Sequence, residues 1–251
     1  MAMKMNWFTK FQPKSLVWIG IVFCVIWETR RGYFKKIPDF FKKVEWGPYL
    51  QMFFSFTIVS IALMFVDPWI LGKIQSYRHP LLQILESIGG WLGRHIHPWM
   101  ILLALYLLFK IILRNEHTAI KFFGALLSGA FSSLVTFTLK YSTLRTRPYG
   151  ARGAFSFFNM EGITKDARLY QSFPSGDVVV VAGACYFLWH QFKHKKWAGI
   201  FLILPLLTAY SRMFLNRHWP SDTFMALGLG WIAAFFFSEY HRYAIRENEP
   251  S

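Results

Sequence analysis

The stretch SRMFLNRHWPSD, residues 211–222, lies at the junction of two strongly apolar runs, 197–212 and 222–240. It gathers a serine, two arginines, a histidine and an aspartate where a membrane-spanning helix would end. Charged side chains at the edge of a span are costly to bury, so this concentration indicates a functional site. His218 and Asp222 stand four residues apart, a spacing that allows a carboxylate to orient an imidazole that does chemistry.

The composition of the 251-residue chain is typical of a polytopic membrane protein. Hydrophobic residues make up 54% of it and charged residues only 16%, and a soluble domain of this size needs more charged surface. The net charge of +15 comes mostly from short loops between apolar runs, which argues against nucleic acid as a partner. Cys24 and Cys185 lie inside apolar runs, without metal-binding spacing, and we expect neither a metal nor another cofactor.

Apolar segments of span length recur along the chain and predict an all-α integral membrane protein. Each segment is long enough for a helix that crosses the bilayer, with its end residues reaching the interface. The six segments are 49–72, 97–114, 121–140, 175–191, 197–212 and 222–240. They define a predicted six-helix membrane core at 49–240, between an N-terminal part at 1–48 and a cytoplasmic tail at 241–251.

The first apolar run, 15–27, predicts an extra N-terminal helix. It is followed by Glu28, Thr29 and Arg30 rather than by a small-residue cleavage site, so we expect it to stay uncleaved. With about 13 residues it is short for a span of about 20. An interfacial helix and a tilted crossing both stay open.

The distribution of Lys and Arg predicts the orientation of the core. With six crossings, one face carries 28–48, 114–121, 191–197 and the C-terminal tail, and it has 14 basic residues when the helix ends are included. The two long loops of the other face, 73–96 and 149–173, carry six, apart from five in the suspected site. The positive-inside rule therefore puts the first face in the cytoplasm. The site would then face the periplasm, across the inner membrane of a bacterium.

Two further polar clusters lie at segment ends on that same predicted side. The first, KYSTLRTRP at 140–148, has a lysine and an arginine that can converge on one anion if the helix unwinds near Pro148. The second, FPSGD at 173–177, offers Ser175 as a helix N-cap and Gly176 for close backbone approach. Helix N-termini bind anions readily. Each cluster alone is also compatible with an ordinary helix end.

The three clusters together describe a phosphate site with a nucleophile, because alternating spans put Arg147, Ser175 and His218 on one side of the membrane. In order and spacing they resemble the signature of the type 2 phosphatidic acid phosphatase superfamily, which reads KxxxxxxRP, PSGH and SRxxxxxHxxxD. The internal spacing of the first and third motifs matches throughout, and the resemblance covers about residues 49–240.

This resemblance implies a mechanism in which a histidine attacks phosphorus and the resulting phosphohistidine is hydrolysed by water. His218 would be the nucleophile, and Asp222 would hold its ring in the reactive tautomer. Fixed cations would stabilise the charge of the transition state without a metal ion. The phosphate-binding residues would be Lys140, Arg147, Ser175, Gly176 and Arg212.

One position departs from the family pattern. Asp177 stands where PSGH has a histidine that protonates the leaving group. An ordinary aspartate is ionised at neutral pH and is a poor acid. Its catalytic role therefore stays open between three explanations: a carboxyl kept protonated by its surroundings, a substrate whose leaving group needs no acid, such as a diphosphate or a sugar 1-phosphate, and an impaired enzyme.

The resemblance implies a metal-independent lipid phosphate phosphatase that meets its substrate at the headgroup level of the bilayer. Bacterial candidates for the substrate are lipid A, undecaprenyl diphosphate and phosphatidylglycerophosphate, and the basic outer loops favour lipid A slightly. Two other readings stay open: a phosphotransferase that passes the phosphoryl group to a lipid hydroxyl, and a catalytically impaired lipid-binding or transport relative. The apolar spans argue against the soluble vanadate-binding haloperoxidases, which share the motifs.

Overall fold

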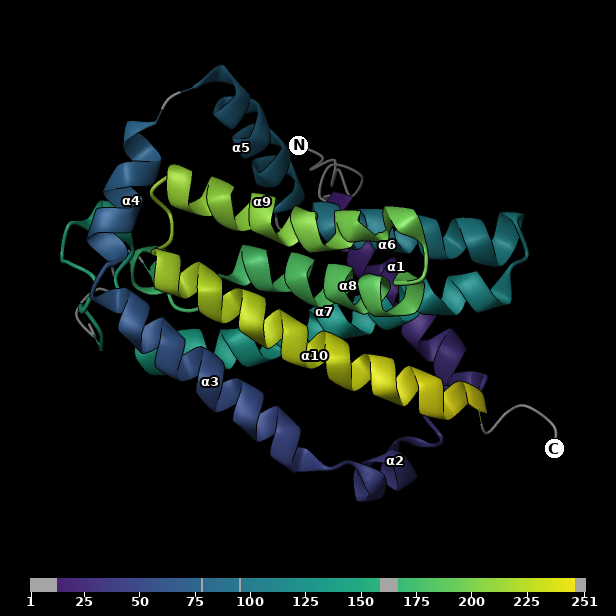
Figure 1. Cartoon of the computed structure of the whole chain (residues 1–251). Coiled ribbons are helices and arrows are strands. Elements are labelled where there is room, and N and C mark those ends of the chain that lie inside the picture. Colours follow the sequence, from purple (N-terminus) through teal and green to yellow (C-terminus); the bar gives the residue numbers. More distant parts are fainter. Residues whose placement is uncertain (1–12, 78, 95, 159–166, 247–251) are drawn as a thin grey trace, which may run out of the picture.

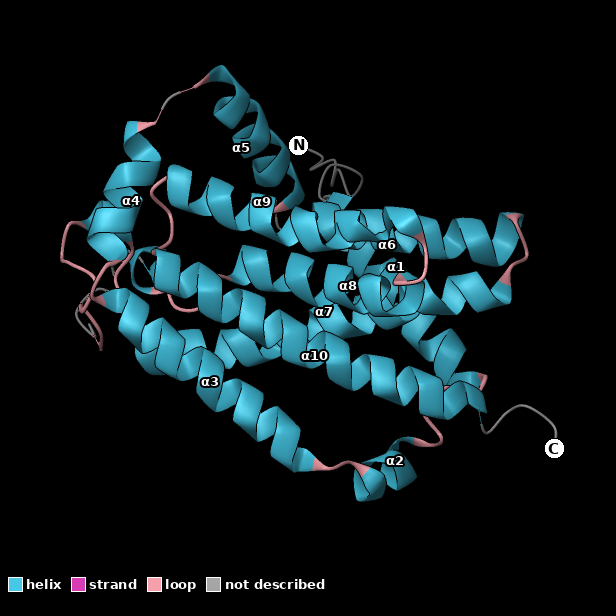
Figure 2. Ribbon diagram, in the orientation of Figure 1, coloured by secondary structure: helices cyan, strands magenta, loops and turns pink. Residues whose placement is uncertain are grey.

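Helices carry almost all of the regular structure in the computed structural model, which describes residues 13–77, 79–94, 96–158 and 167–246. Over these ranges the chain forms no β-strand (Figure 2). A backbone that crosses lipid must satisfy its N–H and C=O groups within its own segment, and the helix does this. The predicted all-α fold is confirmed.

The centre of the molecule is α8 (Gly176–Phe192), which packs against α7 (Glu116–Thr143), α9 (Ile200–Phe214) and α10 (Pro220–Arg246). These helices run side by side in Figure 1. Every residue of α8 from Val178 to Leu188 is buried. Its run of four valines would favour a strand in a half-buried sheet, but enclosure by helices on several sides overrides that preference.

A close approach of α7 and α8 depends on glycine. A Cβ on Gly183 would lie 2.6 Å from the Ser132 side-chain oxygen and 3.2 Å from the Cα of Gly129. The Ser128 hydroxyl donates a hydrogen bond of 2.8 Å to the carbonyl of Gly183. Small residues at such contacts let helix backbones pack closely in membranes, and here they fix the helix that begins at the PSGD motif.

The remaining helices surround this centre (Figure 1). The helix α3 packs on α10, α5 on α9, α6 on α7 and α1 on α6. Their bounds are α1 Pro13–Arg30, α2 Ile37–Lys43, α3 Trp46–Met64, α4 Asp67–Ser76, α5 Pro80–Leu92 and α6 His97–Leu107, with a π-helical continuation at Leu108–Ile112. Short 3-10 turns lie at Pro148–Gly150, Ala167–Tyr170 and Lys196–Gly199.

Four helical stretches of the described residues are long and apolar enough to cross a membrane: Trp46–Met64, Glu116–Gly150, Lys196–Phe214 and Pro220–Ala244. The bent pair of α5 and α6 makes a fifth if it is counted as one span. The prediction of an integral membrane protein is confirmed, whereas the count of six spans stays a prediction. The helix α8 has 17 residues and lies among these spans rather than on their outer surface.

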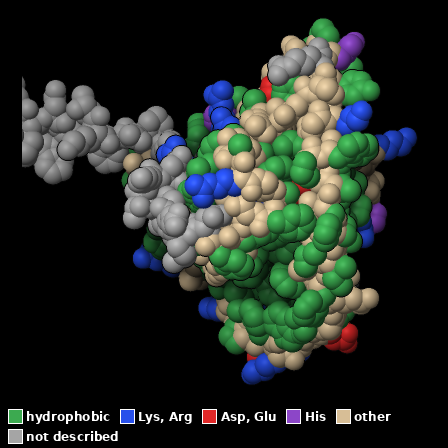
Figure 3. Space-filling model, turned by 90° about the vertical axis from the view of Figure 1, so that its left-hand side faces the viewer, with side chains coloured by type: hydrophobic (Ala, Val, Ile, Leu, Met, Phe, Trp, Pro, Cys, Tyr) green, Lys and Arg blue, Asp and Glu red, His purple; other side chains and the backbone are tan. Residues whose placement is uncertain are grey.

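Large apolar side chains stand exposed on the outer helices, as expected for a surface in contact with lipid. Ile58 on α3 and Leu134 on α7 are 65% and 64% exposed. Figure 3, which looks at the left-hand side of Figure 1, shows hydrophobic side chains spread broadly over the surface and more blue than red among the charged ones.

Three predicted boundaries differ from the helix bounds of the structure. The segment 49–72 breaks after Met64, because Pro68 and the buried Asp67 start a new helix, α4. The predicted outer loop 73–96 contains the whole of α5. The predicted tail begins inside α10, which continues to Arg246, while residues 1–12 and 247–251 of the two predicted terminal parts lie outside the described residues.

Candidate active site

The three predicted clusters meet at one end of the helix bundle, on the left of Figure 1, where α9 ends and α10 begins. The helix α7 stops at Thr143 because Leu144 adopts a left-handed conformation with φ of 44°, which frees the following segment to turn back over the bundle. The turn between α9 and α10 contains Asn216, also left-handed with φ of 59°. These chain reversals gather the motif residues at one surface.

A cavity of about 190 Å³, here called the catalytic chamber, is lined by five of the eight predicted site residues. Its polar wall consists of Lys140, Arg147, Gly176, Asp177 and His218, and Ser133, Thr136 and Phe137 of α7 complete the lining. The Lys140 ammonium donates a hydrogen bond of 2.9 Å to the carbonyl of Gln171. A Cβ on Gly176 would lie 3.6 Å from that ammonium nitrogen, so the N-terminal backbone of α8 and the lysine face the same space.

The ring of His218 is held by a backbone carbonyl. His218 is 1% exposed, and its Nδ1 lies 2.9 Å from the carbonyl oxygen of Ser172. A carbonyl only accepts hydrogen bonds, so Nδ1 carries the proton and Nε2 keeps a free lone pair. The Asp222 carboxylate lies 3.6 Å from Nδ1, too far for a good hydrogen bond, and acts on the ring through its charge.

The electrostatic surroundings keep His218 neutral. Burial lowers the pKa of His218 to about 4, and the cations Arg147 and Lys140 lower it further, while Asp222 opposes this shift. Removal from water disfavours the imidazolium ion. At neutral pH the side chain is therefore an uncharged imidazole, which is the nucleophilic form.

Asp222 belongs to a buried network centred on Arg145. Arg145 is 0% exposed, and its Nη1 donates to Asp222 at 2.5 Å while its Nη2 donates to Asp67 at 2.7 Å. Ser172 and the backbone N–H of Trp219 also donate to Asp222, at 2.5 and 2.8 Å. With these partners Asp222 is fixed as a carboxylate.

Asp67 and Arg145 were missed at the sequence level. Arg145 lies inside the first motif between Lys140 and Arg147, at a position that KxxxxxxRP does not specify. Asp67 is the one charged residue of the predicted segment 49–72. A lone carboxylate in an apolar segment needs a partner, and that signal could have identified it.

Arg212 and Asp177 form an ion pair. The Arg212 Nε lies 3.1 Å from Asp177 Oδ2, with the two side chains 3% and 28% exposed. Arg212 Nη2 also donates to the carbonyl of Gly90 in α5, at 3.3 Å. The carboxylate of Asp177 thus lies at the edge of the chamber with a cation bound to it.

Among the described residues, four buried polar groups of the site have no hydrogen-bond partner. They are the Ser175 hydroxyl, at the N-cap position of α8, the Thr136 hydroxyl, Nε of Arg147, and Nε of Arg212, which is ion-paired with Asp177. Buried polar atoms are nearly always hydrogen-bonded, so the Ser175 hydroxyl and Nε of Arg147 are expected to bind a polar ligand. Within the described ranges, no three His, Cys, Asp or Glu side chains are arranged to hold a metal ion. The mainly cationic chamber suits an anion.

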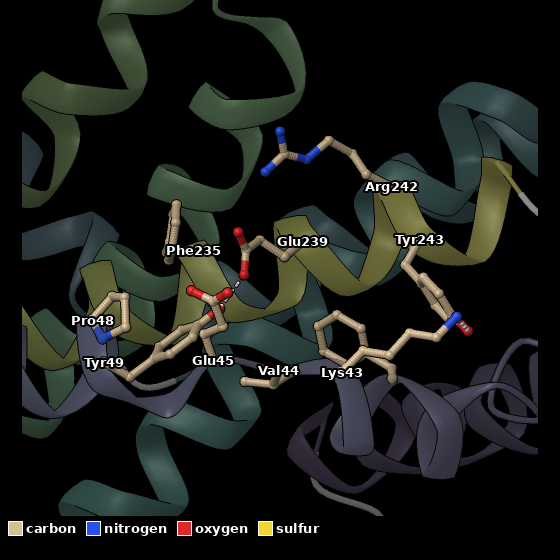
Figure 4. A pocket seen from close by; sticks show the side chains of 10 residues that line it. Lys43, Val44, Glu45, Pro48, Tyr49, Phe235, Glu239, Arg242 and Tyr243 are labelled. Atoms are coloured by element: carbon tan, nitrogen blue, oxygen red, sulfur yellow. Dashed lines mark hydrogen bonds between the residues drawn. The ribbon is translucent and has the colours of Figure 1, made fainter.

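A larger cavity, of about 610 Å³, lies at the opposite end of α10 (Figure 4). Lys43, Glu45, Glu239 and Arg242 contribute its charged groups. From Asp222 to Arg242 the helix rises about 30 Å, and none of the eight predicted site residues lines this cavity. It is separate from the phosphate site.

Comparisons with known proteins agree with the geometry. The sequence model of the PAP2 superfamily matches residues 118–246. YbjG of Escherichia coli (strain K12), provisionally an undecaprenyl-diphosphatase, is 27% identical over 153 residues, covering 54% of this chain and 70% of that protein. An undecaprenyl-diphosphatase of Sulfolobus acidocaldarius is 31% identical over 141 residues, covering 55% of this chain and 61% of the relative, so less than two thirds of that protein is matched.

Two solved structures have the same fold. LpxE of Aquifex aeolicus superimposes with a TM-score of 0.50 and 20% identity, over 69% of this chain and 95% of that structure. A PAP2 type phosphatidylglycerolphosphate phosphatase from Bacillus subtilis gives a TM-score of 0.60 and 19% identity, over 79% of this chain and 98% of that structure. The likeness therefore extends over almost the whole of both known structures.

Proposed function

The chain belongs to the PAP2 superfamily and is a membrane-embedded phosphatase of that family. From this premise we propose that it removes the terminal phosphate of a lipid diphosphate. Undecaprenyl diphosphate is the substrate we favour, since both curated relatives carry that activity in their names. We further propose that the enzyme acts from the periplasmic side of a bacterial inner membrane, because the opposite face carries the excess of Lys and Arg.

In the proposed first step, Nε2 of His218 attacks the terminal phosphorus. An N–P bond forms as the bond from phosphorus to the bridging oxygen breaks, and the lipid monophosphate leaves with that oxygen. The imidazole gains positive charge, which the buried Asp222 carboxylate stabilises from 3.6 Å. In the second step water attacks the phosphohistidine, the N–P bond breaks, and phosphate and a proton are released.

Fixed cations supply the stabilisation of the transition state in this proposal. Lys140 and Arg147 line the chamber, and Arg212 borders it through Asp177. The unpartnered Ser175 hydroxyl and the backbone of Gly176 would donate to the phosphoryl oxygens. Preorganised donors of this kind are worth most where charge develops during reaction.

The ion pair between Arg212 and Asp177 is the observation that carries the choice of a diphosphate. A carboxylate paired with a guanidinium faces a hydrogen-bond donor and is poorly placed to give a proton to a leaving group. An alkoxide leaves poorly without a proton, whereas a lipid monophosphate is a much weaker base and leaves as an anion. The PSGD motif therefore suits an anhydride better than an alkyl phosphate ester.

The test is a phosphate-release assay on purified protein in detergent, with no added lipid acceptor. Undecaprenyl diphosphate, lipid A, phosphatidylglycerophosphate and phosphatidic acid are compared at equal surface concentration, with His218→Ala as the inactive control. We expect release to be fastest from undecaprenyl diphosphate and abolished by His218→Ala. Faster release from phosphatidic acid would contradict the assignment, and release from none of the four would contradict a phosphatase.

A further inference from the structure

A second cavity, of about 580 Å³, adjoins the catalytic chamber and is here called the antechamber. The two cavities share Asp177 in their linings, and Arg212, the ion-pair partner of Asp177, faces the antechamber. The other walls come from α5, the turn between α5 and α6, and the end of α9. The Arg212–Asp177 pair thus separates the chamber from a larger space directly beside it.

The antechamber contains two arginines that the proposed chemistry at phosphorus does not use, Arg94 and Arg217. Both are exposed, and among the described residues neither guanidinium has a hydrogen-bond or ion-pair partner. Arg217 interacts electrostatically with Arg147 and Arg212, both of like charge. Like charges gathered in one place repel each other. Asp177 offsets this at Arg212 through their ion pair, and an anion bound beside Arg217 would relieve the repulsion there.

The acidic groups of the antechamber are already engaged. Asp177 is paired with Arg212, and Glu86 accepts a hydrogen bond of 3.0 Å from the Ser211 hydroxyl. The lining carries three arginines, Arg94, Arg212 and Arg217, against these two carboxylates, so its net charge is positive. An anionic group, rather than a sugar or an ammonium group, fits this space.

An apolar groove of about 340 Å³ lies next to the antechamber, in the membrane region. Leu92 and Pro98 line the groove, while their sequence neighbours Trp91, Gly93 and His97 line the antechamber. The groove runs between α6 and α9 over α8 and has no polar surface. The succession of chamber, charged antechamber and apolar groove matches the succession of terminal phosphate, second phosphate and hydrocarbon chain.

We propose that Arg94 and Arg217 form a subsite for the phosphate that stays on the lipid when the terminal phosphate is transferred to His218. The inference rests on the proposed function and extends it, because it assigns the specificity for diphosphates to two residues that the motifs do not specify: Arg94 lies outside all three, and Arg217 stands at an unspecified position of the third, directly before His218. The two phosphates of a diphosphate share one oxygen, so the second must lie directly beside the chamber, and the antechamber is that space.

The kinetic test compares a polyprenyl diphosphate with the monophosphate of the same chain. Arg94→Gln and Arg217→Gln are each expected to lower the ratio of kcat/KM for diphosphate over monophosphate about tenfold, equivalent to about 1.4 kcal/mol, and the double variant more. Lys73→Gln removes an exposed cation from α4, at the same end of the molecule and outside both cavities, and should leave the ratio unchanged. An equal loss on both substrates, or no loss, would overturn the subsite.

A binding test separates this inference from the proposed function. Methylenediphosphonate, which resists hydrolysis, and inorganic phosphate are titrated calorimetrically into the His218→Ala protein and its Arg94→Gln/Arg217→Gln derivative. The two arginine substitutions should weaken the binding of methylenediphosphonate at least about tenfold more than the binding of phosphate. If wild-type protein hydrolyses no lipid, the proposed function fails while this comparison still decides the subsite. Parallel weakening of both ligands would refute it.

Discussion

At the scale of single residues, the reactivity proposed for His218 depends on a backbone atom. The carbonyl of Ser172 fixes the proton on Nδ1, and burial keeps the ring uncharged. The sequence motif contains neither contribution. It supplies Asp222, whose carboxylate acts on the ring from 3.6 Å and whose hydrogen bonds go instead to Arg145, Ser172 and Trp219.

The buried His218 predicts an unusually acidic lower limit for activity. Since the pKa of His218 is lowered to about 4, the imidazole stays neutral and nucleophilic down to that pH. Activity is lost only as the pH falls through this pKa and the ring becomes protonated. The acid limb of kcat/KM should therefore lie near pH 4 rather than near 6.5, the value of an ordinary histidine. Initial rates between pH 3.5 and 8, in a detergent that keeps the protein folded, check this; an acid limb at about 6.5 would show that the ring is solvated.

Asp177 gives the second prediction at this scale. A general acid contributes roughly 10²- to 10⁴-fold to the rate. If Asp177 were the acid, its replacement would therefore reduce the rate by a factor in that range. Because Asp177 is ion-paired, we expect Asp177→Asn to change the turnover of a polyprenyl diphosphate less than about threefold, well outside that range. Asp177→His, which restores the family residue, should raise activity on phosphatidic acid. A loss of about a hundredfold with Asp177→Asn would assign it the acid role after all.

At the scale of elements, the junction of α3 and α4 is joined to the start of α10 by Asp67. It accepts hydrogen bonds from Arg145 and from the backbone and hydroxyl of Ser221, and it is fully buried. Arg145 also packs against the rings of Phe157 and Trp219, at 5.2 and 5.6 Å. This network holds α10 and the first motif in one arrangement.

Breaking the network should destabilise the fold. Asp67→Ala leaves one side of a buried arginine without a partner, and we expect a loss of about 3–5 kcal/mol in the free energy of unfolding, seen as a lower Tm in detergent. The matched control is Asp39→Ala, which removes an exposed pair with Lys42 that is worth about 0–1 kcal/mol. If both variants melt together, Asp67 has no structural role. A fall in kcat at a temperature where Asp67→Ala is still folded would show that the network also positions Asp222.

The packing of α5 on α9 gives a further prediction. A Cβ on Gly89 would lie 2.0 Å from the carbonyl oxygen of Leu207, so Gly89→Ala must push the helices apart and loosen Arg212. A displacement of about 1 Å at a catalytic group can reduce the rate up to about 100-fold, and we expect a fall in kcat/KM of that order. Gly72→Ala in α4, where nothing lies within 4 Å, is the control. Equal activity of the two variants would exclude α5 from the site.

The sequence predicts those parts of the fold that depend on patterns among residues close together in the chain. Apolar segments ended by charged clusters predict the helices, and alternating spans bring Lys140, Ser175 and His218 to one end. The pairing of Asp67 with Arg145 joins residues 78 positions apart, and no local pattern reports it. Likewise α5 lies in a stretch that alternates apolar and polar residues, and only its packing on α9 shows that it covers the site.

At the scale of the whole molecule, the helix bundle has chemically different ends. The site end holds the chamber, the antechamber and their arginines, while the other end carries the basic segments near Lys43, Lys195 and Arg242. An excess of Lys and Arg in short loops keeps them in the cytoplasm. A lipid diphosphate whose headgroup lies outside the cytoplasm would then reach the chamber without crossing the bilayer.

Orientation can be measured with single cysteines in a background where the buried Cys24 and Cys185 are replaced by alanine. Ser76 is exposed at the end of α4, beside the site, and Lys195 is exposed in the turn between α8 and α9. Ser76→Cys should react with a membrane-impermeant maleimide in cells whose outer membrane is opened, because in the proposed orientation the site end faces the periplasm. Lys195→Cys should react only after the inner membrane is broken. The reverse pattern would place the candidate phosphate site in the cytoplasm and would contradict the proposed orientation. Labelling of both positions from outside would also contradict the proposed orientation, because it would place the two ends of the helix bundle on the same side of the membrane.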